Sequence, residues 1–418
     1  MSTGRVRAAN ISGYDWLLVV AVVALIILGL MMVYSSTAFH GLKYRLDANP
    51  SLLFLKQVLW TAAGVVVLIL LARVNYHRWR RFSVLVLAGT LALLGLVLVL
   101  GREEFGAQRW LIGRLIGAEG GSIQPSELAK LTMILYAADW LASKGERIRQ
   151  VRAGLVPFAV LLGLVVGLIV LQHHLTSAAI VAANGIVMFF VAGGSIWQML
   201  VCGVLGGVSI VLLILESPYR LERVLTFISP FSEQAAKDSP SIQNLIALAS
   251  GGLTGVGLGE SRGKFGYVSV PHSDNIFAIL GEEMGLIGCL AVLGLFAFVA
   301  YRGFRIAMNA PDMFGTLLAT GITFGLVFQA IYNIAVVTAT APIAGITLPF
   351  ISYGGSSMVV SLASIGLLLS ISRATMVSEG TNQLAGGALS SETYDFWGRD
   401  RRARLSRTRR DSLFDRPR

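Results

Sequence analysis

Runs of about twenty apolar residues recur along this chain, and they constrain its fold more than any other feature. A run of that length is long enough to cross a bilayer as an α-helix. The runs are too long and too little alternating for the strands of a membrane barrel. Only 14% of the residues are charged, against about a quarter in a soluble domain. We therefore expect an all-α polytopic membrane protein.

The apolar runs predict ten transmembrane helices, followed by a polar tail. The boundary between the fifth and sixth helices depends on Gln172, His173 and His174, which alone interrupt the pattern there. The first run lacks a convincing cleavage site and is expected to be a retained span. The predicted spans are 14–35, 51–72, 82–100, 125–143, 153–171, 175–193, 196–215, 275–301, 313–338 and 350–372.

These spans divide the chain into three regions. Residues 1–13 form an N-terminal segment, 14–373 the membrane domain and 374–418 a Ser-, Gly-, Thr- and Arg-rich tail that composition predicts to be disordered. Cys202 and Cys289 both lie inside apolar runs, so neither a disulfide framework nor a cysteine metal site is indicated.

Basic residues predict the orientation, because arginine and lysine accumulate in cytoplasmic loops. An even number of spans puts both termini on one side, and the basic loops put that side in the cytoplasm. The large loop between the seventh and eighth helices, residues 216–274, is then extracytoplasmic. The net charge of +11 is explained by these loops and the tail and does not indicate a nucleic-acid partner. The basic residues at cytoplasmic span ends are Arg5, Arg7, Arg73, Arg78, Arg80, Arg81, Lys144, Arg147, Arg149, Arg152, Arg302, Arg305 and Arg373.

Three acids occur in "VPHSDNIFAILGEEMGLIG", at the start of the eighth span. In a helix that begins near Asn275, Glu282 lies about 80° around the axis from Asp274 and about 12 Å deeper, whereas Glu283 faces about 180° away. An intramembrane acid indicates a functional site. The structural alternative is that Asp274 only caps the helix.

Other polar stretches have a structural and a functional interpretation. In "IQPSELAKL", Glu127 and Lys130 share a helix face, either as a neutralising ion pair or as a polar patch that offers Lys130 to an anion. In "AQRWLIG", Arg109 lies beside a tryptophan. It is either a residue of the membrane interface or a guanidinium that binds the phosphates of a substrate. In "TLPFISYGGSSMVVS", Ser356 and Ser357 either permit close packing or line a site.

Two further stretches resemble ligand sites but are not interpreted as such. The glycine-rich "GGLTGVGLGESRGKFG", 251–266, lacks the Gly-Lys-Ser/Thr ending and the strand–helix context of a phosphate loop. The adjacent His173 and His174 point in different directions and have no neighbouring acid, so we predict no metal there.

Together, "QRW", "QPSELAKL", "GGLTGVGLGESRGKFGYVSVPHSDNIFAILGEEMGLIG" and "ITLPFISYGGSSM" resemble the FtsW/RodA/SpoVE (SEDS) family, from the first span to Arg373. The resemblance implies a ten-helix fold and a peptidoglycan glycosyltransferase. Such enzymes polymerise lipid II at the outer face of the cytoplasmic membrane, together with a class B penicillin-binding transpeptidase.

The resemblance also implies roles for individual residues. Asp274 matches the proposed catalytic aspartate, which would take the proton from the acceptor hydroxyl. Positive side chains would stabilise the leaving pyrophosphate, and a divalent cation (Mg²⁺ or Mn²⁺) could add to their charge; no metal ligand is assigned. The residues expected to bind substrate are Arg109, Lys130, Glu127, Gln124, Lys264, Glu282, Ser356 and Ser357.

Two positions depart from the family pattern. His174 occupies a place where many members have an acid, so the role of that acid is not transferred to it. Asn275 replaces the usual aromatic residue after the aspartate.

The motifs favour the division-type FtsW branch, located at the septum with other divisome membrane proteins. A RodA-type elongation enzyme, a SpoVE-type sporulation enzyme, a lipid II flippase and a non-catalytic scaffold stay open as alternatives.

Overall fold

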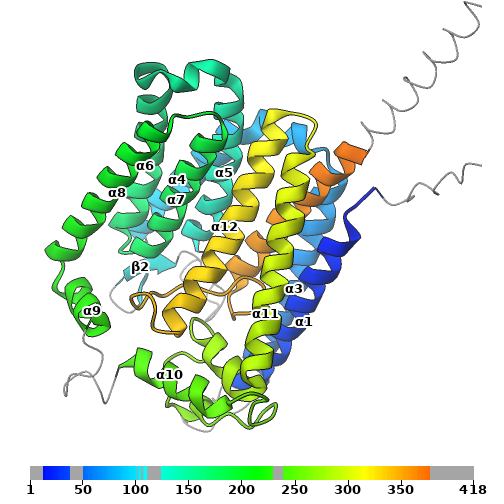
Figure 1. The fold of residues 1–418 in the computed structure, drawn as a ribbon, viewed down its shortest axis with the longest axis vertical. Coiled ribbons are helices and arrows are strands. Elements are labelled where there is room, and N and C mark those ends of the chain that lie inside the picture. The colour runs from blue at the N-terminus through cyan, green and yellow to red at the C-terminus, as the bar shows by residue number, and fades with distance from the viewer. Residues whose placement is uncertain are drawn as a thin grey trace, which may run out of the picture.

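The computed structural model describes residues 13–37, 50–100, 102–104, 107–110, 124–228 and 239–376. Within these ranges the chain forms a bundle of long helices (Figure 1). Eight described helices are long and apolar enough to cross a membrane. They are α1 (Trp16–Thr37), α3 (Pro50–Arg73), α4 (Tyr76–Leu100), α6 (Val156–Leu171, preceded by the π-turn η2, Val151–Leu155), α8 (Ile196–Glu216), α11 (Ile276–Met308), α12 (Met313–Val337) and the C-terminal helix Gly355–Met376.

Two more helices, α5 (Pro125–Lys144) and α7 (Leu175–Val191), pack against each other and against α12 within the bundle. α7 is short, with 17 residues, and α5 carries charged side chains along its length. The prediction of an all-helical, polytopic membrane protein is confirmed, whereas the count of ten spans and the topology stay predictions. The predicted N-terminal segment and the tail beyond residue 376 lie outside the described residues.

Local sequence explains where several helices begin. Pro125 occupies the first turn of α5, where a missing N–H costs nothing. The Ser195 hydroxyl and the Gln198 side chain form a reciprocal capping box at the start of α8. Asp312 caps α12 by accepting from a backbone N–H of the first turn, 3.3 Å away.

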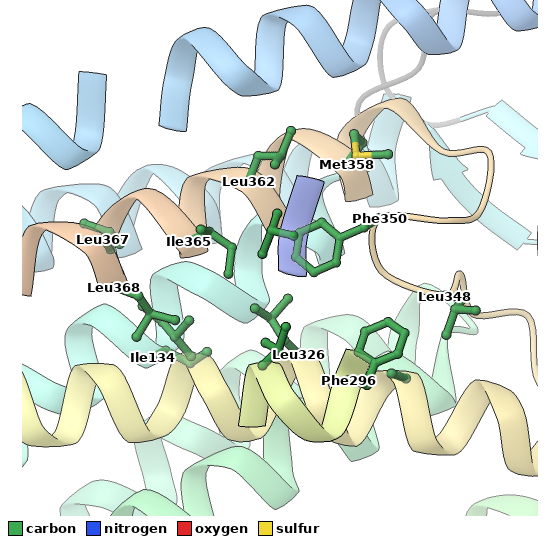
Figure 2. Packing of buried hydrophobic residues seen from close by; sticks show 14 of the residues in the cluster. Ile134, Phe296, Leu326, Leu348, Phe350, Met358, Leu362, Ile365, Leu367 and Leu368 are labelled. Atoms are coloured by element: carbon green, nitrogen blue, oxygen red, sulfur yellow. The ribbon is translucent and has the colours of Figure 1, made fainter. Parts of the chain in front are cut away.

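The most deeply buried spans of the bundle are α12 and the C-terminal helix. Within their apolar windows, 72% of α12 and 83% of the C-terminal helix are buried, against 6% of α8 at the edge. Figure 2 shows Leu362 and Ile365 of the C-terminal helix, Phe350 of the preceding loop and Leu326 of α12 within one cluster of buried apolar side chains. Because lipid is as apolar as leucine, this close packing is what holds the helices together.

One end of the bundle, which we call the loop end, carries α9 (Pro218–Ile228), α10 (Pro240–Gly251) and the hairpin of β1 (Arg102–Glu104) and β2 (Ala107–Trp110) (Figure 1). Residues 216–274, predicted as a large extracytoplasmic loop, contain two helices. A proline opens each of the two helices there, and a 3₁₀ turn, η3 (Gly263–Phe265), follows them.

α11 is not continuous, in contrast to the predicted span 275–301. Gly285 has φ 66° and ψ −164°, which breaks the helix after its first turns. The segment 252–257 fills the break, and a Cβ on Gly285 would lie 2.4 Å from the nitrogen of Gly255. The backbone groups freed by the break therefore bond to this segment, as a broken membrane helix requires. These bonds run from Val256 N to Glu282 O (3.0 Å), Gly257 N to Glu283 O (3.2 Å), Leu286 N to Gly252 O (3.0 Å) and Ile287 N to Leu253 O (3.2 Å).

Candidate active site

Asp274 lies at the loop end, directly before α11, and its side chain is partly exposed. The hydroxyl of Ser273 donates to its Oδ1 over 3.0 Å. Its backbone carbonyl accepts from Nδ2 of Asn333 on α12, 2.8 Å away. The N-cap position of α11 belongs to Asn275, which makes no side-chain capping bond. Asp274 is therefore a fixed, solvent-reachable carboxylate rather than the residue at the cap.

The loop between α12 and the C-terminal helix, residues 338–354, which we call the strap, packs against Asp274. Asn333 donates to the carbonyl of Ile346 in the strap over 2.7 Å with the same amide nitrogen that it uses for Asp274. The hydroxyl of Ser352 donates to the carbonyl of Ser273 over 2.8 Å. The side chains of Asn333 and Ser352 thus hold the strap and Asp274 together by donating to backbone carbonyls.

Other helices also bind the strap. Gln57 of α3 accepts from the backbone N–H of Gly354 over 3.2 Å and donates to another strap carbonyl.

Tyr353 donates its backbone N–H to the carbonyl of His272, and burial raises the pKa of its phenol. The phenol therefore stays neutral at physiological pH and adds no charge beside the site.

A polar chain leads from α5 to the strap. Lys130 Nζ donates to Glu127 Oε1 over 2.7 Å, which is the predicted i,i+3 pair, and to Gln329 Oε1 over 2.6 Å. Gln329 donates in turn to the carbonyl of Thr347 over 2.9 Å, and the Thr347 hydroxyl lies 2.8 Å from that of Ser357. The chain places a buried positive charge close to the strap and neutralises it with one carboxylate.

A small cavity beside Lys130 measures about 30 Å³, which is room for about two water molecules. Glu127, Asn184 and Gln329 contribute to its lining. The Oδ1 atom of Asn184 is buried and has no protein partner, so a water molecule in this cavity would satisfy it.

The two acids of "GEE" are both buried and both engaged within the protein. Glu282 accepts from the backbone N–H of Arg262 over 2.9 Å, from that of Gly263 and from the hydroxyl of Ser261. Glu283 Oε1 lies 3.3 Å from Lys264 Nζ in an ion pair whose side chains are 0% exposed. We call this arrangement the clasp, because it fastens residues 261–264 to the start of α11.

A side chain of α1 also takes part in the clasp. The hydroxyl of Ser35, near the end of α1, donates to Glu283 over 2.5 Å and accepts from Lys264 over 3.3 Å. Lys264 also donates to the carbonyl of Gly259. The structure therefore gives Glu282 and Lys264 a structural role, and their predicted contact with substrate stays a prediction.

The predicted phosphate-binding cation Arg109 lies on β2 at the loop end. Arg262, which the sequence did not single out, is exposed and lies in the same loop as Asp274. Of the predicted substrate residues, Ser357 reaches the strap directly, and Ser356 is buried next to it.

Gln124 was predicted to bind substrate, and its side chain lies 3.4 Å from Nδ1 of His174. Sequence reasoning missed His174, Gln57, Gln329 and Asn333 as site residues. The sequence marks each of them only as a single amide or imidazole within an apolar run. Such a residue does not indicate which neighbour its side chain contacts.

Among the described residues, no group of three or more His, Cys, Asp or Glu side chains is arranged to hold a metal ion. These residues therefore offer no donor set for a cation held by the protein alone.

The comparisons with known proteins bear on this arrangement. A family described as FTSW_RODA_SPOVE, cell cycle protein, matches residues 15–376. The chain belongs to the FtsW/RodA/SpoVE family. Stage V sporulation protein E of Bacillus subtilis is 40% identical over 86% of this chain and 97% of its own length. The probable peptidoglycan glycosyltransferase FtsW of Trichlorobacter lovleyi is 38% identical over 87% of this chain and 94% of its own.

Solved structures of the FtsW/RodA/SpoVE family share the fold. One, from work on polymerization and crosslinking by a peptidoglycan synthase complex, has 29% identity and a TM-score of 0.69 and covers 87% of this chain and 98% of that chain. The crystal structure of the rod shape determining protein RodA of Thermus thermophilus has 29% identity and a TM-score of 0.63, with the same coverage. The family resemblance inferred from the motifs is confirmed.

Proposed function

We propose that this chain is a peptidoglycan glycosyltransferase that polymerises lipid II into β-1,4-linked glycan strands. Its family membership and its relatives named as peptidoglycan glycosyltransferases support the activity. The observation that carries the assignment of the site is Asp274, a partly exposed carboxylate fixed at the loop end by Asn333 and Ser273. A general base needs this combination of access and fixed position.

In the proposed reaction, Asp274 accepts the proton of the 4-hydroxyl of the acceptor sugar. The hydroxyl oxygen bonds to the anomeric carbon of the donor, and the bond from that carbon to undecaprenyl pyrophosphate breaks. The donor is α-linked and the product β-linked, so a single displacement with inversion accounts for the stereochemistry.

The leaving pyrophosphate needs positive charge where its negative charge develops. We propose that Arg109 and the exposed Arg262 supply it, because a guanidinium matches phosphate oxygens with two parallel bonds. Lys130, with Glu127 as its partner, would act from beneath the strap. Gln124, Ser356 and Ser357 would complete the wall of the site.

We further propose that α5 and α7 complete a ten-helix membrane domain with both termini in the cytoplasm. Arg302 and Arg305 lie at the end of α11 remote from Asp274, which supports an extracytoplasmic loop end. The cytoplasmic membrane at the division septum would be its location, with a class B penicillin-binding transpeptidase and other divisome proteins as partners. The solved synthase complex supports a partner of this kind.

The leading alternative is a lipid II transporter, which requires acids deep in the membrane and a path open to both faces. Glu127, Glu282 and Glu283 instead lie in the first turns of helices that begin at the loop end. The cavity of about 30 Å³ beside Lys130 is far smaller than a lipid-linked disaccharide. These features favour chemistry at one face.

Purified protein with labelled lipid II tests the proposal. Asp274→Asn, which keeps the shape of the side chain and removes its basicity, is expected to reduce glycan polymerisation by 10²-fold or more. Glu260→Gln, an exposed acid on the same loop, serves as the matched control and should keep the parental rate. Parental polymerisation by Asp274→Asn would refute the assignment. Lipid II transport without polymerisation would support the alternative.

A further inference from the structure

His174 is a buried imidazole in the turn that leads into α7, and it joins three parts of the loop end. Its Nδ1 lies 3.2 Å from the hydroxyl of Ser126 and 3.4 Å from the amide nitrogen of Gln124, both at the start of α5. Its Nε2 lies 3.4 Å from the carbonyl oxygen of Gly345 in the strap and 3.3 Å from the hydroxyl of Ser177.

These partners determine which nitrogen carries the proton. The amide nitrogen of Gln124 can only donate, so Nδ1 must accept. The carbonyl of Gly345 can only accept, so Nε2 must donate. The two serine hydroxyls rotate to suit either role. With these partners Nε2 carries a proton that it donates to the strap carbonyl, and a carboxylate in this place could not donate to the strap.

Gly345 itself touches the catalytic candidate. A Cβ on Gly345 would lie 3.2 Å from Oδ2 of Asp274, so the strap backbone packs directly against the carboxylate. The next carbonyl of the strap, that of Ile346, is held by Asn333, which also holds the carbonyl of Asp274. The short piece of strap beside the carboxylate is thus fastened on one side by Asn333 and on the other by His174.

We propose that His174 is a positioning residue for Asp274: its Nε2–H holds the Gly345 carbonyl and so fixes the strap backbone against the catalytic carboxylate. The proposal rests on the proposed role of Asp274 as the base. It explains why an imidazole serves here, since the contact to be made is a donated hydrogen bond. Displacement of a reacting group by about 1 Å can reduce a rate by 10²-fold.

The test compares three substitutions at or beside this contact in the purified full-length protein. His174→Leu removes the donor and is expected to lower kcat for lipid II polymerisation at least tenfold, with KM changed less than about twofold. His174→Gln keeps an N–H near the place of Nε2 and should retain at least half of the parental kcat. Gly345→Ala leaves His174 intact, displaces the Asp274 carboxylate by a few tenths of an ångström and should lower kcat, by less than the leucine variant does.

The neighbouring His173 provides the control. It is exposed and has φ 58°, so His173→Asn preserves a residue that tolerates this backbone and should leave kcat unchanged. Thermal unfolding of each variant shows that it is folded. If His174→Leu does not fold, His174→Gln and Gly345→Ala carry the test.

Parental kcat in folded His174→Leu or in folded Gly345→Ala, with Asp274→Asn inactive, would overturn this inference and leave the proposed function standing. Equal loss in folded His174→Gln and His174→Leu would overturn it too, because the donor would not be what matters. Parental polymerisation by Asp274→Asn would instead remove the proposed function itself.

Discussion

Lys264→Met tests the clasp that holds the loop before Asp274 to the start of α11. The substitution removes the ammonium group and keeps most of the length of the side chain. Glu283 would then remain fully buried with the Ser35 hydroxyl as its described partner in place of an opposite charge. The same change would also free the carbonyl of Gly259 from its donor.

The expected cost follows from the burial of both partners. Breaking a buried ion pair by removing one member costs about 3–5 kcal/mol, because the other charge stays desolvated. At about 1.4 kcal/mol for each factor of ten, opening of the clasp becomes at least roughly a hundredfold more favourable. The double substitution Lys264→Met with Glu283→Gln leaves no unpaired charge and should recover most of this loss.

Hydrogen exchange measures the opening directly. The amides of Val256 and Gly257 donate across the break in α11, so their exchange reports whether the inserted segment has separated. In Lys264→Met, peptides that contain these amides should exchange at least roughly a hundredfold faster, while peptides of α12 stay unchanged. The double variant should return toward the parental rate.

Parental exchange in Lys264→Met would show that the ion pair does not hold the segment. Equal acceleration in the single and double variants would show that the lysine acts through packing or through the Gly259 carbonyl and not through its charge. Either result would refute the argument from the buried pair.

Three further predictions concern other contacts. Gly255→Ala places a Cβ 2.1 Å from a backbone carbonyl of α11 at φ 83°, so folded yield from membranes should fall sharply, whereas the alanine variant of open Gly259 should lose far less. Asn333→Leu removes both amide bonds to the site carbonyls and should lower kcat at least tenfold in a folded protein, measured by lipid II polymerisation. Arg302→Ala leaves Asp15 buried and unpaired and should lower the midpoint of thermal unfolding by several degrees, whereas exposed Arg305→Ala should not.

The long apolar runs predicted the helices well, because a bilayer leaves the backbone few other structures. The predicted starts of the spans near 51, 125, 175, 196 and 313 agree with the observed helices to within one residue. The i,i+3 pairing of Glu127 with Lys130 was also predictable, since it depends on local spacing alone.

The break in α11 was not predictable in the same way. Gly285 stands in an otherwise helical pattern, and glycine is common in membrane helices. What ends the helix is the arrival of residues 252–257, some thirty positions earlier in the chain, with their own backbone donors and acceptors. Asp274, Glu282 and Glu283 all precede the break, so their predicted arrangement around the helix axis is not affected by it and stays a prediction.

The site contacts show the same limit. Asn333 and Gln329 lie in one apolar span, and their spacing marks a polar face. That spacing does not reveal that Asn333 contacts Asp274 and Gln329 contacts Lys130, because both contacts depend on how the strap folds back. His174 likewise acquires its partners only when α5, α7 and the strap meet.

The discontinuity at Gly285 separates two lengths of chain that a straight rod would couple. An extra residue inserted just after Ile287, beyond the four bonds to segment 252–257, would turn the remainder of α11 by about 100° in the membrane and leave the acid-bearing piece where that segment holds it. The same insertion between Asp274 and Glu282 would instead rotate Asp274 by about 100° relative to Glu282, which residues 261–263 hold in place. The position of the Asp274 carboxylate thus depends on Asn333, the strap and the short helix before the break, and not on the part of α11 beyond the break.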